Sequence, residues 1–153
     1  MNRVAVRAEE VPLPSWETRL HAYSLRVLDY LHRDDWDLSV LLCNDAYIRS
    51  LNARFRNKDE ATDVLSFPLG AAVPGDHTGE SRYLPGDIVI SLESLEENSG
   101  YFHVSPDEEL RRLLIHGILH LDGYDHDTND KTEPMLQLQE QLLAELAGEH
   151  ILL

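Results

Sequence analysis

The residues most able to carry out chemistry are three histidines within eleven residues, His116, His120 and His126. His116 and His120 are four residues apart, so on a helix their imidazoles lie on one face and can bind the same ion. Gly123 predicts the end of that helix, because glycine adopts the left-handed conformation that turns the chain and brings His126 back as a third ligand. Three protein ligands with an open fourth position are typical of catalytic zinc. The sequence therefore predicts one Zn²⁺ per chain.

The spacing of these histidines is that of the metzincin zinc peptidases, with one difference. Those peptidases have a glutamate directly after the first histidine, which acts as the general base, and this chain has Gly117 there. A peptidase mechanism of that type therefore lacks its proton acceptor. A solvated helix face is the simpler explanation of two spaced histidines. However, residues 115–121 are apolar on several sides, and buried histidines need partners.

A cluster of cations, Arg54, Arg56 and Lys58, is the second group able to act on a charged substrate. It follows a predicted helix and precedes a short apolar strand that we expect to end at Pro68, and loops between such elements often carry binding groups. Acidic neighbours nearly balance these charges. Composition alone therefore also allows an ordinary solvated loop.

The charge of the chain limits where a phosphate can bind. The 153 residues carry 13 basic and 28 acidic groups, a net charge of −15, whereas nucleic acids normally bind to basic surfaces. Residues 1–60 carry 9 basic and 10 acidic groups, and residues 61–153 carry 4 and 18. Any phosphate site must therefore be local.

Length and composition predict a single domain over residues 1–153, since no linker rich in proline, glycine or serine divides the chain. No stretch approaches 18 apolar residues and the first residues do not resemble a signal peptide, so no membrane partner is expected. The lone cysteine, Cys43, fits a buried thiol in a reducing compartment. The expected location is the cytoplasm.

The elements that position these residues follow from periodicity and turn signals. Apolar runs predict strands at residues 4–6, 36–43, 64–67 and 86–91. Capping residues and helical periodicity predict helices from Ser15, from Asn44 or Asp45 to about Arg54, from Ser91 to near Gly100, from Ser105 to Leu121, and from about Thr132. Residues 70–83, which include His77, are rich in turn-forming residues and predict a long mobile loop.

Three motifs in this order resemble the bacterial YbeY family. They are F-R-N-K-D-E-A-T-D-V-L-S-F-P at residues 55–68, G-D-I-V-I-S at residues 86–91 and H-G-I-L-H-L-D-G-Y-D-H at residues 116–126. Phe55 stands where tyrosine is common, Asn57 stands where glycine is common, and Pro85 precedes the second motif. The resemblance implies an α+β fold, a single domain in which a mixed four-stranded sheet packs around a central metal-binding helix.

The resemblance also implies a function. It is that of a single-strand-specific, zinc-dependent endoribonuclease that matures the 3′ end of small-subunit ribosomal RNA and takes part in ribosome quality control. On this resemblance His116, His120 and His126 bind the metal, Arg56 acts with His116 and His120 in catalysis, and Arg56 and Lys58 contact RNA. The implied partners are single-stranded and ribosomal RNA, the small ribosomal subunit with its proteins, and a ribosome-associated GTPase.

Arg56 suits phosphate chemistry because its planar fork can hold two phosphate oxygens and stabilise the extra charge of a transition state. The candidate proton acceptors are Asp87, Asp122 and Asp125. The candidates for base stacking are Tyr83, Tyr101 and Phe102. Two alternatives stay open: a zinc-dependent hydrolase of another substrate such as peptide, and a non-catalytic ribosome-assembly factor with a structural zinc.

Overall fold

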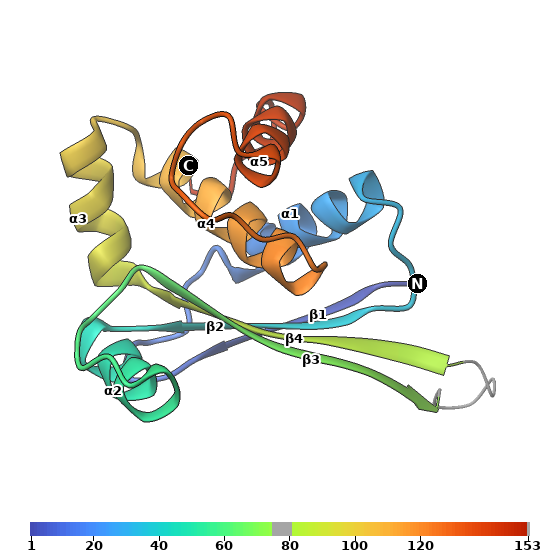
Figure 1. Cartoon of the computed structure of the whole chain (residues 1–153), viewed down its shortest axis with the longest axis horizontal. Coiled ribbons are helices and arrows are strands. Elements are labelled where there is room, and N and C mark those ends of the chain that lie inside the picture. The colour runs from blue at the N-terminus through green and yellow to red at the C-terminus, as the bar shows by residue number, and fades with distance from the viewer. Residues whose placement is uncertain (75–80, 153) are drawn as a thin grey trace.

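The computed structural model describes residues 1–74 and 81–152, and Figure 1 shows how their helices and strands are arranged. The elements in chain order are β1 (Arg3–Ala8), α1 (Glu17–Tyr30), β2 (Asp37–Cys43), α2 (Asp45–Arg56), β3 (Val64–Pro74), β4 (Ser81–Ser91), α3 (Leu92–Phe102), α4 (Pro106–Leu121) and α5 (Pro134–Glu145). The four strands form one mixed sheet. The predicted α+β class is confirmed.

The strands of the sheet follow the order β1-β2-β4-β3, with β1, β2 and β4 parallel and β3 antiparallel at one edge. Because side chains alternate along a strand, the two faces of β4 bury different clusters. Ile88 and Ile90 pack with the helices of one face, and Val89 packs with α2 on the other. Figure 1 shows α1, α4 and α5 stacked above the sheet and α2 below it.

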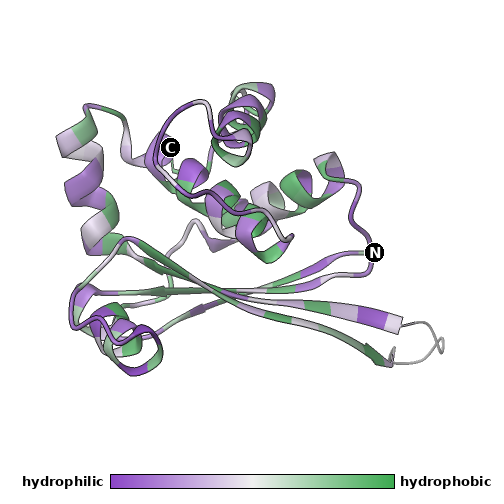
Figure 2. Ribbon diagram, in the orientation of Figure 1, coloured by the Kyte–Doolittle hydropathy of each residue, from purple (hydrophilic) through white to green (hydrophobic). Residues whose placement is uncertain are grey.

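Helix α4 lies in the middle of the molecule, in contact with the sheet and with α5. Its inward positions are fully buried, among them Leu114, Ile115 and Ile118. Figure 2 shows hydrophobic colour along this helix and on the strands beneath it, whereas the segment between α4 and α5 is mostly hydrophilic. No described helix is both long and apolar enough to cross a membrane. The core therefore fixes the helix that carries two of the three histidines.

Both ends of α4 are as predicted. At its start the Ser105 hydroxyl accepts a hydrogen bond from the Glu108 N–H at 3.1 Å. At its end Gly123 has φ +94, its N–H donates to the His120 carbonyl at 3.1 Å, and the Tyr124 N–H donates to the Leu119 carbonyl at 3.0 Å. This pair of bonds is the Schellman motif, which reverses the chain directly after the helix.

The stretch at residues 70–83 is largely a β-hairpin, so the prediction of a long loop is wrong. Strand β3 continues to Pro74 and β4 begins at Ser81, while residues 75–80, including His77, lie outside the described residues. The prediction that Pro68 ends the strand also fails. An edge strand tolerates proline, and here the pairing of β3 with β4 shifts register between Pro68 and Ala71.

The unusual residues of the family motifs fit this backbone. Asn57 ends α2 in the left-handed conformation, with φ 56 and ψ 32, which asparagine tolerates better than most residues. Pro85 lies opposite the register shift, between the paired residues Leu84 and Gly86. A Cβ on Gly86 would lie 2.1 Å from the Phe67 carbonyl oxygen, so the close approach of the two strands requires glycine.

Three helix boundaries differ from the prediction. Helix α1 starts at Glu17 without a side-chain cap, so Ser15 is not its N-cap. Helix α5 starts at Pro134, and α2 continues past Arg54 to Arg56. The last difference affects the site, because it places the guanidinium of Arg56 on the final turn of a helix instead of a loop.

Candidate metal centre

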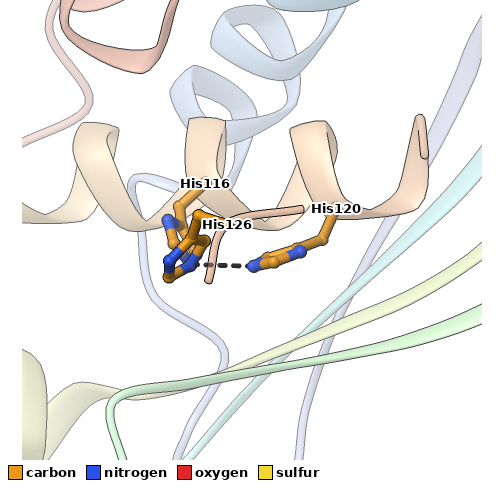
Figure 3. Close-up of side chains that lie close together, drawn as sticks. All are labelled: His116, His120 and His126. Carbon is orange, nitrogen blue, oxygen red and sulfur yellow. Dashed lines mark hydrogen bonds between the residues drawn. The ribbon is translucent and has the colours of Figure 1, made fainter. Parts of the chain in front are cut away.

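Three imidazole rings converge on the side of α4 that faces the sheet (Figure 3). The Nε2 atoms of His116 and His120 lie 3.1 Å apart, and the ligand nitrogens of these two residues and His126 lie within 4.8 Å of one another. Two nitrogens bound to one tetrahedral zinc lie roughly 3.3 Å apart, as follows from Zn–N bonds of about 2.0–2.1 Å. The structure thus brings together all three histidines that the sequence singled out, in a geometry that fits a metal ion.

The second nitrogen of each ring has its own partner. The contacts are His116 Nδ1 to Gln139 Oε1 at 2.7 Å, His120 Nδ1 to the Tyr124 carbonyl at 3.2 Å, and His126 Nδ1 to the Thr128 carbonyl at 2.8 Å. Carbonyl oxygens only accept hydrogen bonds, so each Nδ1 carries the hydrogen. A neutral ring in this tautomer presents the unprotonated Nε2, the atom that binds a metal.

Two of the rings are held in the neutral form by their surroundings. Burial lowers the pKa of His116, and the nearby His126 lowers it further. Burial also lowers the pKa of His120, with smaller contributions from the other two imidazoles. Because the ordinary histidine pKa is about 6.5, both rings are neutral at pH 7. Two unprotonated Nε2 atoms 3.1 Å apart repel each other unless a cation lies between them.

His116 and His120 line a cavity of about 440 Å³ whose opposite wall is the edge strand β3. Its other lining residues are Val64, Leu65, Ser66 and Pro68 from β3, Gly123, Tyr124 and Asp125 after α4, and Arg56. Helix α2 covers the opposite face of the sheet, but the Arg56 guanidinium reaches the β3 edge, where Nη2 donates to the Ser66 carbonyl. Arg56, His116 and His120 therefore face one cavity.

Lys58 lies beside this cavity, in an adjoining hollow of about 270 Å³ that it shares with Arg56 and Asn52. Its acidic neighbour Asp59 pairs with Arg49 at 2.8 Å. Within the described part of the chain, neither Arg56 nor Lys58 forms an ion pair. Both positive charges therefore remain available to an anion, which favours a binding role over an internally balanced loop.

Of the three candidate proton acceptors, the cavity contains one. Asp125 lines it, and its carboxylate accepts a hydrogen bond from the His126 N–H at 2.8 Å. Asp122 is turned away, because its nearly buried carboxylate pairs with Arg33 at 2.8 Å. Asp87 is exposed on the sheet face that α2 covers, opposite α4. Asp87 and Asp122 are therefore not in the site.

The aromatic residues expected to stack bases lie elsewhere. Tyr83 packs against Trp36, with ring centroids 5.1 Å apart. Tyr101 and Phe102 form an exposed pair at the end of α3. None of the three lines the histidine cavity. Their aromatic rings favoured a base-stacking role, but their positions in the structure do not support that role at the histidine cavity.

Two groups near the site were not predicted. Gln139, from α5, orients His116, and its own amide N–H donates to Glu140 at 3.2 Å, which turns the amide oxygen toward the imidazole. Phe55 and Phe67 lie beside Arg56, with ring centroids 5.6 Å apart. A local signal existed for Phe55, which stands between two arginines in the sequence, whereas nothing local pointed to Gln139.

Gly117 also has a structural explanation. A Cβ at this position would lie 2.9 Å from Cγ2 of Ile88 on β4, because α4 packs directly on the sheet here. The glutamate that metzincin peptidases carry after their first histidine would therefore collide with the core. The close packing of α4 on the Ile88 side chain therefore disfavours that general base, beyond its absence from the sequence.

Residues 5–147 match the family model described as endoribonuclease YbeY. The chain belongs to this family. Relatives named endoribonuclease YbeY include those of Treponema pallidum, 46% identical over 145 residues (95% of this chain, 90% of the relative), and Treponema denticola, 45% over 143 residues (93% and 92%). A Borrelia turicatae relative of the same name is 47% identical over 140 residues (90% of each).

A solved structure has a similar fold. The solution structure of a Thermotoga maritima protein superposes with a TM-score of 0.59 at 31% identity, covering 95% of this chain and 90% of that one. The matched region of the family model includes the histidines, Arg56 and the strand motif at residues 86–91. The resemblance seen in the sequence motifs is confirmed.

Proposed function

We propose that residues 1–153 act as one YbeY domain that cleaves single-stranded RNA with the help of a zinc ion. The observation that supports this proposal most directly is that the Nε2 atoms of His116 and His120 lie 3.1 Å apart. The Nδ1 atom of each of these rings is already hydrogen-bonded to an oxygen. Such an arrangement is favourable around a cation, and it faces the uncompensated guanidinium of Arg56. A cation site beside an anion-binding group suits a phosphodiester.

Zinc is the proposed metal because the three donors are imidazole nitrogens, with no cysteine nearby to close the site. His116, His120 and His126 would hold it. When bound, zinc supplies Lewis acidity and a nucleophile at neutral pH. Cys43 does not compete for the ion, because burial raises the pKa of its thiol to about 12 and the side chain packs in the α2-side core.

Arg56 is the proposed phosphate-binding catalytic group. Its guanidinium is held by the Ser66 carbonyl and lies 5.6 Å from the centroid of the Phe67 ring. A guanidinium fixed in this way keeps further N–H groups for two phosphate oxygens, and it stabilises the charge that develops in the transition state. Lys58 adds a positive charge in the adjoining hollow, where the RNA backbone would continue.

Asp125 is the proposed proton acceptor. Among the described residues it is the only acidic side chain that lines the cavity, and the hydrogen bond from the His126 N–H fixes its carboxylate. A general base must lie within hydrogen-bond reach of the proton that it removes, and Asp125 is on the same wall as the histidines.

The shape and charge of the site support single-strand specificity. The cavity lies between a helix and a sheet edge, so an unpaired strand can bend into it, whereas a rigid duplex presents its phosphates on the outside of a cylinder. Arg56 and Lys58, which form no ion pair within the described residues, lie close together in a chain with a net charge of −15. The site can therefore contact only a few phosphates, and we expect no binding of RNA along an extended basic surface.

On the family resemblance we extend the proposal to cellular roles. These are maturation of the 3′ end of small-subunit ribosomal RNA and ribosome quality control in the cytoplasm, with the small ribosomal subunit, its proteins and a ribosome-associated GTPase as partners. The packing of Gly117 against Ile88 disfavours the peptidase alternative. An assembly factor with a structural zinc would bind RNA without cutting it.

The test compares three substrates with one zinc-loaded preparation: an unpaired RNA, the same RNA annealed to its complement, and casein. We expect cleavage of the unpaired RNA only, its loss after chelation and its recovery on adding zinc. Cleavage of casein but not RNA would favour the peptidase alternative. RNA binding without metal-dependent cleavage would favour the assembly factor.

A further inference from the structure

The exposed ring of Phe55, at the end of α2, adjoins the proposed site but belongs to none of its cavities. We infer that Phe55, backed by Phe67, is a stacking platform for an unpaired base next to the cleaved phosphodiester. This inference rests on the proposed RNA cleavage and deepens it by adding a base-binding subsite on the other side of the β3 edge.

The ring is exposed but firmly supported. Tyr47, Leu51 and Phe55 are spaced by four residues along α2, and the first two pack with Phe67 in the cluster on this face of the sheet. Phe55 is 57% exposed and meets Phe67 edge to face at 70°. Such a contact orients one aromatic ring against another, and the exposed part of Phe55 stays accessible to a ligand.

Two guanidinium groups flank this aromatic pair. The Arg54 guanidinium lies 5.2 Å from the centroid of Phe55, and that of Arg56 lies 5.6 Å from the centroid of Phe67. Arg56 also lines the histidine cavity. One side chain therefore separates the aromatic platform from the proposed phosphate position, so neighbouring parts of one RNA strand can contact both.

Aromatic rings flanked by cations are the usual surface for single-stranded nucleic acid, because bases stack on the rings while the cations attract the backbone. The other exposed aromatic pair of the described chain lacks this setting. Tyr101 and Phe102 are 77% and 58% exposed, but α3 carries three glutamates and no lysine or arginine. A phosphate backbone would be repelled there, so exposure alone does not make a platform.

The competing explanation is that Phe55 only covers the apolar edge of the α2-side cluster. Leucine would serve that purpose nearly as well, but it has no π-face. Phe55→Leu therefore removes stacking while keeping apolar cover, whereas Phe55→Tyr and Phe55→Trp keep an aromatic face. Tyr101→Leu is the matched control, since it removes an even more exposed ring, 77% against 57%, from an acidic helix.

The experiment uses the full-length zinc-loaded protein and short unpaired RNAs with 2-aminopurine at one position, which is moved along the strand. Fluorescence is followed after rapid mixing, before cleavage develops, because stacking quenches this base. We expect quenching at one or two adjacent positions near the cut and a Kd about 5- to 100-fold weaker for Phe55→Leu. Phe55→Tyr, Phe55→Trp and Tyr101→Leu should bind within about twofold of the parent.

The outcomes separate this inference from the proposed function. If the parent cleaves RNA in a metal-dependent way but Phe55→Leu binds and quenches like the parent, the platform is wrong and the function stands. The platform is also wrong if Phe55→Leu binds weakly and neither Phe55→Tyr nor Phe55→Trp restores binding, because the loss is then structural. A parent that neither binds nor cleaves unpaired RNA overturns both.

Discussion

What the cavity can bind depends on which nitrogen of each histidine carries the hydrogen. The structure settles this through three oxygen acceptors, of which two are backbone carbonyls and one is the side chain of Gln139. Backbone carbonyls cannot be changed by substitution, so the contact of Gln139 with His116 is the one that mutation can test. Gln139 is a positioning residue, because it acts through the imidazole and not on the substrate.

We predict that Gln139→Leu weakens zinc binding about 10- to 100-fold, since the His116 ring loses the partner that fixes its tautomer and orientation. Competition with a chromogenic chelator measures the affinity directly, without any assay of activity. Gln137→Leu, a change at an exposed position of the same helix, serves as the control. Equal affinities for the parent and Gln139→Leu would contradict the orientation that we describe.

A second prediction concerns Arg56 and separates catalysis from metal binding. Arg56→Lys should keep zinc and melting temperature but lose about 10²- to 10³-fold in single-turnover cleavage, because a point charge cannot donate two parallel hydrogen bonds. Arg49→Lys, which retains the pairing with the exposed Asp59, should cleave at the parent rate. Similar rates for Arg56→Lys and the parent would show that the cation cluster is an ordinary solvated surface and not a phosphate-binding site.

The position of the histidine helix depends on how closely α4 approaches the sheet. Gly117 makes this approach possible, because any side chain there would press on Ile88. The same contact holds the imidazoles at a fixed height opposite β3, where Ser66 and Arg56 complete the cavity. A change at this helix–strand contact should therefore affect stability first and the geometry of the site second.

Gly117→Ala should destabilise the protein by about 1–3 kcal/mol, the usual cost of overpacking a core, despite the better helix propensity of alanine. Gly100→Ala in α3 is the matched control. A Cβ at Gly100 meets nothing within 4 Å, so this change should stabilise the protein by up to about 1 kcal/mol. Denaturant unfolding compares the two, and a stabilised Gly117→Ala would show that the contact with Ile88 is loose.

The parts of the fold that the sequence predicted correctly are those set by local signals. The Ser105 cap, the glycine turn at Gly123 and the spacing of the histidines each act within a few residues. The extension of β3 beyond Pro68 was missed because it depends on pairing with β4 across a register shift between Pro68 and Ala71. The sequence did not predict Gln139 or the contact between Phe55 and Phe67 for a similar reason, since only tertiary packing brings these residues to the site.

The C-terminal segment is tied to the start of α4 through one buried carboxylate. Asp107 pairs with Arg111 at 2.9 Å and accepts hydrogen bonds from the N–H groups of Ile151 at 2.7 Å and Leu152 at 2.8 Å. The imidazole of His150 also contacts it at 2.9 Å. Segments more than forty residues apart are therefore held together at the helix that carries the metal site.

Asp107 makes the stability of the whole molecule depend on pH. Burial raises the pKa of Asp107, but hydrogen bonds from His150 and from the Leu152 and Ile151 N–H groups outweigh it, so the net pKa lies below the ordinary 3.8. A carboxyl group with a lowered pKa stabilises the fold above its unfolded value, and this contribution is lost as the pH falls through the folded value. The ionised carboxylate therefore contributes fully at pH 7.

We predict that Asp107→Asn lowers the free energy of unfolding by about 2–4 kcal/mol at pH 7, because Arg111 is left in the core without its charge partner. The difference from the parent should shrink as the pH falls below about 4, where the parent also loses this charge. Urea unfolding at several pH values measures both. A difference that stays constant down to pH 3 would rule out the ionised carboxylate as the source.

Metal-dependent cleavage at the three histidines is tested most directly by a zinc titration of metal-free protein, followed by single-turnover cleavage of one unpaired RNA. We predict no cleavage without metal and a rate that rises linearly to a break at one zinc per chain, whereas His120→Ala should show neither the break nor the rate. Full cleavage by metal-free protein, or a protein saturated with one zinc that leaves the RNA intact, would contradict this prediction.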